Sequence, residues 1–273
     1  MNKLRVGLAQ VPQTADIKTN CDKALEYMEI ASSKGVELLC FPETHLSGYR
    51  VGIVAPEAPC DSDGLKQALD TLRQKCRKLS TEIIVGTETP NASGRPYNSA
   101  VVLDRDGETL GVHHKSRITV LDAKGYAPGS GPTPFIFDGI PMGLVICYEG
   151  YRFPENTRLL ARDHKARVVF HPQASTTLPN MEWKIPVLEA LVVARAAETT
   201  MYFISANISS PYSNCRSLVI APDGLIQAAT ALKEEMLVVA DIDPGLATHA
   251  FLEDDPEKIF KASGEYDGVM GNR

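Results

Sequence analysis

The sequence predicts an α/β fold of four layers, in which two β-sheets pack face to face and helices cover the outer side of each sheet. Three observations lead to this prediction. Apolar runs typical of buried strands alternate with helical stretches, and the same order of strands and helices occurs twice along the 273 residues. Several strands are apolar on both faces, so each must be covered on two sides. An α-β-β-α sandwich of two similar halves meets that requirement.

The first half of the chain opens directly on a strand pattern, Leu-Arg-Val-Gly-Leu-Ala-Gln at residues 4–10. Helices are expected where apolar residues recur at spacings of three and four. The strands predicted for this half are residues 4–10, 37–42, 82–87 and 98–103, and its helices are residues 18–34 and 65–79.

The second half repeats this order. Val-Gly-Leu-Ala at residues 6–9 resembles Met-Gly-Leu-Val at 142–145, and an Asp-Gly turn occurs in each half, at residues 106–107 and 223–224. The likeness indicates two structurally similar halves. The strands predicted here are residues 142–147, 166–172, 201–206 and 217–221, and the helices are residues 155–165 and 185–199.

The segment between the halves, residues 125–134, is too short and too rich in proline to be a flexible tether, so we expect an ordered loop. We therefore expect a single domain over residues 1–273. Residues 246–273 carry several glycines and the acidic run Glu-Asp-Asp-Pro-Glu with little periodicity, and they are expected to form a C-terminal tail.

Composition excludes several classes of partner. The formal charge of −6 and the absence of a Lys/Arg stripe interleaved with aromatic residues argue against nucleic acid. No apolar stretch approaches the length of a membrane span, so no membrane is expected and the chain is expected to be cytoplasmic. The six cysteines form no close pairs and have no histidine at ligand spacing, so neither disulfides nor a metal site is predicted.

One cysteine, Cys147, has a suggestive setting. It follows the apolar run of residues 144–146, and Phe-Pro-Glu at residues 153–155 is typical of a helix entry. Ligands of open α/β sheets bind beyond the carboxyl ends of the strands, and a thiol near a helix N-terminus is favoured as thiolate. The alternative is that Cys147 packs as a small apolar residue, which is the interpretation we adopt for Cys21, Cys40, Cys76 and Cys215.

A cysteine nucleophile needs a base and a group that stabilises the developing anion. Glu43 follows a predicted strand of the first half and should lie at the same sheet edge as Cys147, although most glutamates in loops are simply solvated. Lys115 follows the first Asp-Gly turn and could equally be a solvated surface lysine. A Cys-His pair is a rival, and the histidines available for it are His45, His113, His114 and His171.

Three ordered fragments resemble the signatures of the nitrilase superfamily, also called the carbon-nitrogen hydrolases. They are Phe41-Pro42-Glu43 with Gly48-Tyr49, His114-Lys115 with Pro128-Gly129, and Cys147-Tyr148-Glu149 with Arg152-Phe153-Pro154-Glu155. Weaker likeness runs from residues 6–10 through 194–198, 206–207 and 222–224 to 241–243 and so spans nearly the whole chain. The resemblance implies the nitrilase-like form of the sandwich predicted above.

The resemblance also implies a role for each residue: Glu43 as general base, Lys115 as oxyanion stabiliser and Cys147 as nucleophile, with no metal or organic cofactor. The charges of Glu43 and Lys115 have opposite effects on the pKa of the Cys147 thiol. A carboxylate beside a thiol raises the pKa of the thiol, and a nearby ammonium compensates. Members of the family commonly carry a second glutamate a little past the lysine; here the nearest acid is Asp122, which either substitutes for it or leaves the role unfilled.

Further residues are expected around the site. Tyr49, Tyr148 and the loop of residues 171–175 are predicted to line the pocket, and Tyr49, Tyr148, His171 and Asp122 are predicted to contact the substrate. Glu149, Arg152 and Glu155 are expected to form a structural charge network that fixes the turn after Cys147. Trp183, at the start of a predicted helix, is expected to anchor packing rather than to contact a ligand.

We therefore predict a thiol hydrolase that cleaves the carbon-nitrogen bond of a small amide through a cysteine thioester. The sequence after Cys147 is more similar to the amidase and carbamoyl-hydrolase branches than to the nitrilases, in which a tryptophan commonly follows the cysteine. A nitrilase, an acyl transferase, or a non-catalytic binding or scaffold protein on the same fold are the alternatives. A nucleotide-binding domain is set aside because no glycine-rich phosphate loop follows the first strand. The resemblance suggests a homodimer or a larger homo-oligomer.

Overall fold

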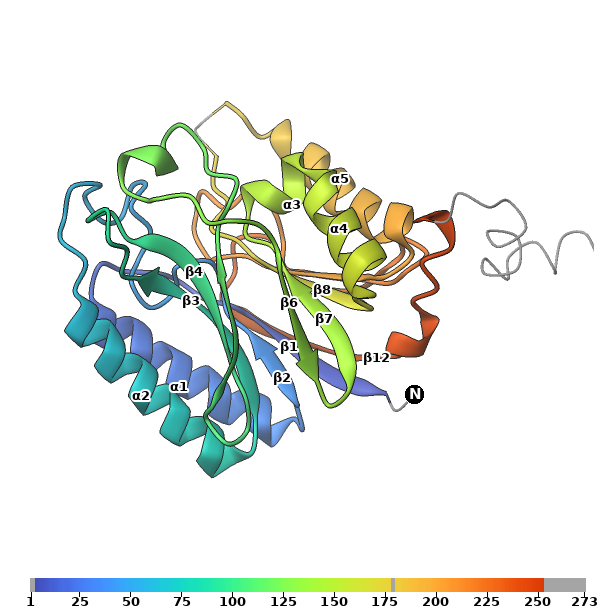
Figure 1. Ribbon diagram of the computed structural model, residues 1–273, viewed down its shortest axis with the longest axis horizontal. Helices are drawn as coiled ribbons and strands as arrows, with labels where there is room; N and C mark the ends of the chain where they lie inside the picture. Colours follow the sequence, from blue (N-terminus) through green and yellow to red (C-terminus); the bar gives the residue numbers. More distant parts are fainter. Residues whose placement is uncertain (1–2, 178–179, 253–273) are drawn as a thin grey trace, which may run out of the picture.

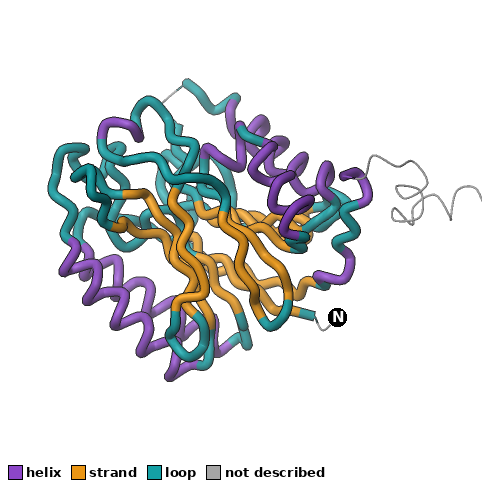
Figure 2. Tube along the Cα trace, in the orientation of Figure 1, coloured by secondary structure: helices purple, strands orange, loops and turns teal. Residues whose placement is uncertain are grey.

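The computed structural model describes residues 3–177 and 180–252. Two six-stranded sheets lie face to face, and helices cover the outer side of each (Figures 1 and 2). This is the predicted four-layer α-β-β-α sandwich.

The first sheet has the order β12-β1-β2-β3-β4-β5. β1 pairs with β2 and β2 with β3 in parallel, whereas the remaining neighbours are antiparallel. Its strands are β1 (Leu4–Gln10), β2 (Leu38–Cys40), β3 (Glu82–Thr89), β4 (Tyr97–Leu103), β5 (Thr109–His114) and β12 (Met236–Ile242).

The second sheet has the order β11-β10-β9-β8-β7-β6, with parallel pairing of β7 with β8 and of β8 with β9. Its other neighbours are antiparallel. Its strands are β6 (Thr133–Phe137), β7 (Ile140–Leu144), β8 (Val168–Pro172), β9 (Tyr202–Ala206), β10 (Leu218–Ile220) and β11 (Ile226–Ala229).

The two sheets match strand for strand, which confirms the prediction of two similar halves. β1 through β5 correspond in order and direction to β7 through β11, and β12 lies antiparallel to β1 as β6 does to β7. β12 comes from the C-terminal end of the second half, yet it completes the sheet of the first half. The sequence analysis did not predict this exchange of a strand.

Alternation of side chains explains the layers. Val6 and Leu8 of β1 belong to the core between the sheets, while Ala9 belongs to the core under the helices of the first sheet. The outer helices are α1 (Ile17–Ser33) and α2 (Ser62–Leu79) on the first sheet, and α3 (Tyr148–Arg152), α4 (Pro154–His164) and α5 (Lys184–Thr199) on the second (Figure 1). Asp16 and Asp61 cap α1 and α2 by accepting backbone N–H groups.

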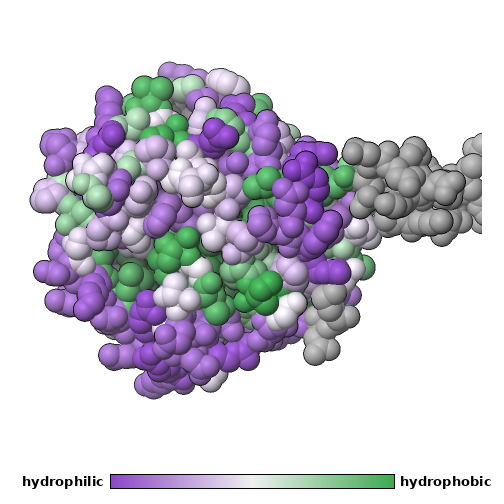
Figure 3. All heavy atoms as spheres, viewed as in Figure 1, coloured by the Kyte–Doolittle hydropathy of each residue, from purple (hydrophilic) through white to green (hydrophobic). Residues whose placement is uncertain are grey.

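Figure 3 shows a largely hydrophilic surface with apolar side chains gathered near the middle of the face in view. β5 and β6, which lie side by side at one edge of the two sheets, each carry an exposed apolar residue, Leu110 and Ile136. Within the described ranges, no helix combines the length and apolar character needed to cross a bilayer.

The predicted tail begins with two short 3-10 helices, η2 (Pro244–Leu246) and η3 (Ala250–Leu252), and its remainder lies outside the described residues. The predicted loop of residues 125–134 ends earlier than expected, because β6 begins at Thr133. It runs past the end of β5, where the N–H of Gly129 donates to the carbonyl of Lys115 at 2.8 Å. A side chain at Gly129 would collide with the backbone of His114, so only glycine permits this approach.

Candidate active site

Cys147 lies at the turn between β7 and α3, with the unusual dihedrals φ 45° and ψ −104°. Its N–H donates to the carbonyl of Pro172 at 3.0 Å, and its own carbonyl accepts a hydrogen bond from Nε2 of His171 at 2.8 Å. Strained backbone of this kind persists only where the surroundings fix it. Cys147 is partly exposed, so its thiol at the end of β7 can be reached from solvent.

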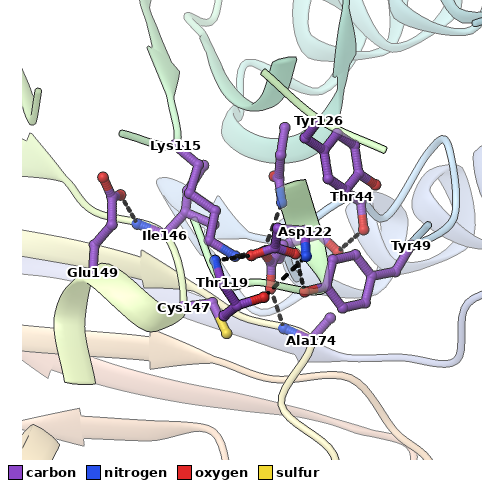
Figure 4. Close-up of polar contacts among 12 residues, drawn as sticks. Thr44, Tyr49, Lys115, Thr119, Asp122, Tyr126, Ile146, Cys147, Glu149 and Ala174 are labelled. Carbon is purple, nitrogen blue, oxygen red and sulfur yellow. Dashed lines mark hydrogen bonds and ion pairs between the residues drawn. The ribbon is translucent and has the colours of Figure 1, made fainter. Parts of the chain in front are cut away.

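Glu43 is fully buried just beyond the end of β2. Its Oε1 accepts from Nζ of Lys115 at 2.7 Å and from Nδ2 of Asn98 at 2.7 Å, and its Oε2 accepts the N–H of Ala174 at 2.8 Å. Figure 4 shows the side chain of Lys115 and the backbone of Ala174 close to Cys147. The carboxylate is thus fixed by contacts from both halves of the chain.

Lys115 follows β5 and is also fully buried. Besides Glu43 its ammonium contacts Oδ2 of Asp122 at 2.9 Å. Asp122 begins the 3-10 helix η1 (Asp122–Lys124) and also accepts the hydroxyl of Tyr49 at 2.5 Å and the N–H of Thr119 at 3.0 Å. One buried ammonium therefore lies between two buried carboxylates, and Figure 4 shows its contact with Asp122.

These groups shift the ionisation of one another. Burial raises the pKa of the Cys147 thiol well above its usual range, and Glu43 raises it further, while Lys115 acts in the opposite direction. Burial alone would lower the pKa of Lys115, but Glu43 and its other negative neighbours raise it well above normal. Burial likewise opposes ionisation of Asp122, and Lys115 and Tyr49 outweigh it, so the pKa of Asp122 is lowered. The resting site therefore holds a neutral thiol beside a charged lysine.

Two substitutions are expected to move the pKa of Cys147 in opposite directions. Glu43→Gln removes a negative charge, so the pKa of the Cys147 thiol should fall. Lys115→Met removes a positive charge, so the same pKa should rise. The pH dependence of Cys147 alkylation by iodoacetamide measures both, with the wild-type protein between the two variants. Shifts of the same sign would contradict this electrostatic account.

Glu149 joins the segments that carry the lysine and the cysteine. Its carboxylate is fully buried; Oε2 accepts the N–H of Ile146 at 2.7 Å and contacts Nε2 of His113 at 2.7 Å, while Oε1 accepts the N–H of Ser116 at 2.7 Å. Burial would raise its pKa, but His113 and these hydrogen bonds outweigh it and lower the pKa to about 2. The residue before Cys147 and the residue after Lys115 are thus held by one side chain.

The predicted structural role of Glu149 has different partners from those expected. Arg152 and Glu155 are exposed, and within the described part of the chain neither forms an ion pair with Glu149. Arg152 is the last residue of α3 and Glu155 lies in the first turn of α4, both on the solvent side, whereas the partner His113 comes from β5 of the other sheet. The network predicted from Glu149, Arg152 and Glu155 is therefore corrected to Glu149, His113 and Ser116.

Glu149→Gln is expected to lower the free energy of unfolding by about 3 kcal/mol at neutral pH, because a pKa of about 2 lies well below the ordinary 4.5 of a glutamate. A lowered pKa stabilises the folded state above pH 4.5, and this contribution is lost as the pH falls towards 2. Urea unfolding at pH 7 and at pH 3 measures it. The difference between wild type and variant should shrink at the lower pH; an unchanged difference would contradict the assignment.

The histidines do not form the rival Cys-His pair. His45 contacts the carbonyl of Asn20, His114 contacts Ser99, and His113 is engaged by Glu149. His171 contacts the backbone oxygen of Cys147 and the hydroxyl of Ser205. Among the described residues no imidazole is hydrogen-bonded to the Cys147 sulfur, whereas the carboxylate of Glu43 lies close enough to raise the pKa of the thiol.

The residues that were predicted to contact the substrate lie in different surroundings. His171 is fully buried, with Nε2 on the Cys147 carbonyl and Nδ1 at 2.8 Å from Oγ of Ser205, so the prediction that it faces the pocket is corrected. Asp122 contacts Lys115 and Tyr49 directly, and its contact with substrate stays a prediction. Tyr148 packs edge-on against Phe153 and is partly exposed beside the thiol.

Asn98 is a site residue that the sequence analysis missed, whereas Ala174 lies in the loop of residues 171–175 that was predicted to line the pocket, and only its contact with Glu43 was not predicted. Asn98 is the second residue of β4, and Ala174 follows β8; their contacts with Glu43 depend on a side-chain amide and a backbone N–H that no local pattern distinguishes.

The predicted packing role of Trp183 was wrong, since its side chain is 61% exposed. Cys21, Cys40, Cys76 and Cys215 are buried, as expected of packing residues.

A cavity of about 410 Å³ adjoins the site. Tyr49 and Ala174, which contact Asp122 and Glu43 respectively, form part of its wall. A larger cavity, of about 630 Å³, lies between α1 and α2 on the outer side of the first sheet and includes none of the three predicted catalytic residues.

Within the described residues no group of three His, Cys, Asp or Glu side chains could hold a metal ion.

Comparison with known proteins agrees with this arrangement. The family described as carbon-nitrogen hydrolase matches residues 5–250. A chloroplastic omega-amidase of Arabidopsis thaliana is 28% identical over 261 residues, covering 89% of this chain and 68% of the relative. An (R)-stereoselective amidase of a Pseudomonas species is 30% identical over 206 residues, which cover 75% and 70% of the two chains.

The fold has solved counterparts. An amidase from a Nesterenkonia species aligns with a TM-score of 0.78 at 23% identity, over 94% of this chain and 95% of that one. At this identity the likeness shows the fold alone, the nitrilase-like sandwich of two sheets. The family match covers most of the chain and includes Glu43, Lys115 and Cys147. The chain belongs to the carbon-nitrogen hydrolase family.

Proposed function

We propose that the protein hydrolyses a small amide to a carboxylic acid and ammonia or an amine, with Cys147 as nucleophile, Glu43 as general base and Lys115 as oxyanion stabiliser. The single observation that carries this proposal is the buried contact of Glu43 with Lys115 beside a partly accessible thiol. A charged lysine between two carboxylates, 0% exposed, is a costly arrangement that a packing role alone does not require.

In the first step the thiol proton passes to Glu43 while sulfur attacks the amide carbon. The raised pKa of Cys147 means that a free thiolate does not accumulate, so proton transfer and attack are coupled. The C–S bond forms as the C=O double bond opens, and the negative charge moves to oxygen.

Two donors remain for that oxygen. Lys115 has three N–H bonds, of which two are engaged by Glu43 and Asp122, so the third is left for the oxyanion. Tyr148 is the first residue of α3, where a backbone N–H has no acceptor within the helix. Preorganised donors of this kind stabilise the charge that develops in the transition state.

Glu43 then returns the proton to the departing nitrogen, the C–N bond breaks, and a thioester remains on Cys147. In the second half-reaction Glu43 takes a proton from water, the resulting hydroxide attacks the thioester carbon, and the thiolate leaves and regains the proton. Each step balances without a metal or an organic cofactor. We also propose that the two halves act as one catalytic domain, because Glu43 and Lys115 come from one sheet and Cys147 from the other.

An ammonia-release screen tests the proposal, with short aliphatic amides, ω-amides of dicarboxylates, N-carbamoyl amino acids and nitriles, and with Cys147→Ala as the matched control. Release that depends on Cys147 supports a hydrolase. Transfer of the acyl group to an added amine in preference to water would favour the acyl transferase, turnover of nitriles alone would favour the nitrilase, and no Cys147-dependent turnover would favour the scaffold. The cytoplasmic location and the homo-oligomeric state stay predictions.

A further inference from the structure

The cavity beside the site has an uncharged lining. Its apolar residues are Val51, Ile53, Ala174 and Ile208, and its polar lining consists of hydroxyl side chains and a glycine backbone. None of the described residues that line it carries a charge. The nearby cations are engaged elsewhere: Lys115 contacts Glu43 and Asp122, and the guanidinium of Arg117 lies 5.2 Å from the ring centre of Phe153, outside the lining.

The position of the cavity relates it to the reacting groups. Its wall includes Ala174, whose N–H holds Glu43 at 2.8 Å, and Tyr49, whose hydroxyl holds Asp122 at 2.5 Å. A substrate carbonyl at Cys147 would therefore have this cavity next to it. The volume of about 410 Å³ lies within the range of small-molecule sites.

We infer that the part of the substrate that occupies this cavity is uncharged and largely apolar, so that the enzyme prefers amides of neutral aliphatic acids to ω-amides of dicarboxylates. This inference rests on the proposed function. A carboxylate against the inner wall of the cavity, where Ala174 and Ile208 are buried, would lose part of its hydration without gaining a cationic partner, and that loss is unfavourable. Hydroxyl groups of the lining can accommodate a polar but neutral substituent.

Three matched amides test the inference: 5-methylhexanamide, glutaramide and glutaramate, which end in an isopropyl, a carboxamide and a carboxylate group of similar shape. Wild-type kcat/KM is expected to be at least about 100-fold higher for 5-methylhexanamide than for glutaramate, with glutaramide between them. Val51→Arg places a cation at the half-buried cavity wall and should raise the glutaramate to 5-methylhexanamide ratio at least about tenfold. Val51→Met, which is similar in length but neutral, should not.

The outcomes separate this inference from the proposed function. Equal or faster turnover of glutaramate by an enzyme that Cys147→Ala inactivates would overturn the inference and leave the hydrolase intact. If Arg117→Gln then removed that preference, carboxylate recognition would belong to Arg117 instead. Failure of all three amides to release ammonia in a Cys147-dependent manner would overturn both. If Val51→Arg does not fold, Ile208→Arg provides the same charge from the opposite segment.

A second, independent observation concerns the hydrogen bonds that lead to Cys147. The hydroxyl of Tyr151 donates to Oε1 of Gln173, Nε2 of Gln173 donates to Oγ of Ser205 at 2.6 Å, and Ser205 meets Nδ1 of His171 at 2.8 Å. A carbonyl oxygen only accepts, so Nε2 of His171 must carry the proton that it shares with Cys147, and Nδ1 accepts from Ser205. Burial lowers the pKa of His171 to about 4, which agrees with a neutral ring.

The geometry points to His171 as a positioning residue that holds the strained backbone of Cys147. The ring lies directly against the turn, since a Cβ at Gly150 would come within 2.7 Å of Nε2 of His171. The φ of 45° at Cys147 directs the thiol, and loss of the donor to its carbonyl would let the turn relax. Small displacements of a nucleophile have large effects on rate.

His171→Leu is expected to lower kcat by about 10- to 100-fold with KM unchanged within about twofold, because the nucleophile and not the pocket is displaced. His171→Gln, which presents an amide N–H near the position of Nε2, should recover most of the loss. A rise in KM at constant kcat, or equal losses in both variants, would overturn the inference. If His171→Leu does not fold, Ser205→Ala removes only the hydroxyl that fixes the tautomer and should lower kcat in the same way; an unchanged kcat would contradict it.

Discussion

Cys147→Ala is expected to reduce turnover by about five to six orders of magnitude, the loss seen when a covalent nucleophile is removed from a site whose groups act as a unit. Glu43 and Lys115 are tied to each other at 2.7 Å, so neither can take the place of the thiol in forming the acyl intermediate. The fold should persist, because the substitution removes one sulfur from a partly accessible side chain. Single-turnover ammonia release and urea unfolding measure the two effects.

The matched control is Cys215→Ala. Cys215 is buried in the core under the helices of the second sheet, so its substitution should lower stability and leave kcat nearly unchanged. Turnover by Cys147→Ala within tenfold of wild type would remove Cys147 from the mechanism. Cys147→Ser adds a further comparison, because a hydroxyl has the same position but is far harder to deprotonate than a thiol.

The layers of the fold could be predicted because they follow from local patterns. Apolar runs such as residues 4–10 appear in the structure as β1, and the repeat of Val-Gly-Leu-Ala by Met-Gly-Leu-Val marks the corresponding strands β1 and β7. The residues of β11 are half-buried or exposed, and in β12 only Ala240 and Ile242 are buried, so neither strand shows the burial pattern of a central strand. Their pairing is decided by long-range contacts that no local window contains.

The site was predictable only in part, for a similar reason. Glu43, Lys115 and Cys147 each follow a strand, as predicted, but the expectation that Glu43 and Cys147 share one sheet edge was wrong: β2 and β5 belong to the first sheet and β7 to the second. The face-to-face packing of the two sheets brings the three residues together. The hydrogen bonds around them depend on side-chain directions. His171 faces the turn of Cys147 and not the cavity because Ser205 and Gln173 hold its ring, and that arrangement needs coordinates from β8 and β9.

Lys115→Met is expected to lower kcat by about a thousandfold, the typical effect of one oxyanion donor. It should also lower the free energy of unfolding by about 3–5 kcal/mol, because Glu43 and Asp122 lose the cation that both contact and remain buried. Lys124→Met is the matched control: Lys124 is exposed nearby on η1, so both quantities should stay close to wild type. Steady-state kinetics and urea unfolding measure them.

A double variant separates the two roles of Lys115. Asp122→Asn, added to Lys115→Met, removes one of the two carboxylates that were left without a cation, so part of the lost stability should return. The rate should not return, since neither methionine nor asparagine supplies the positive donor that the oxyanion needs. Recovery of kcat together with stability would mean that Lys115 acts only by supporting the fold, and the assignment of the oxyanion role would fail.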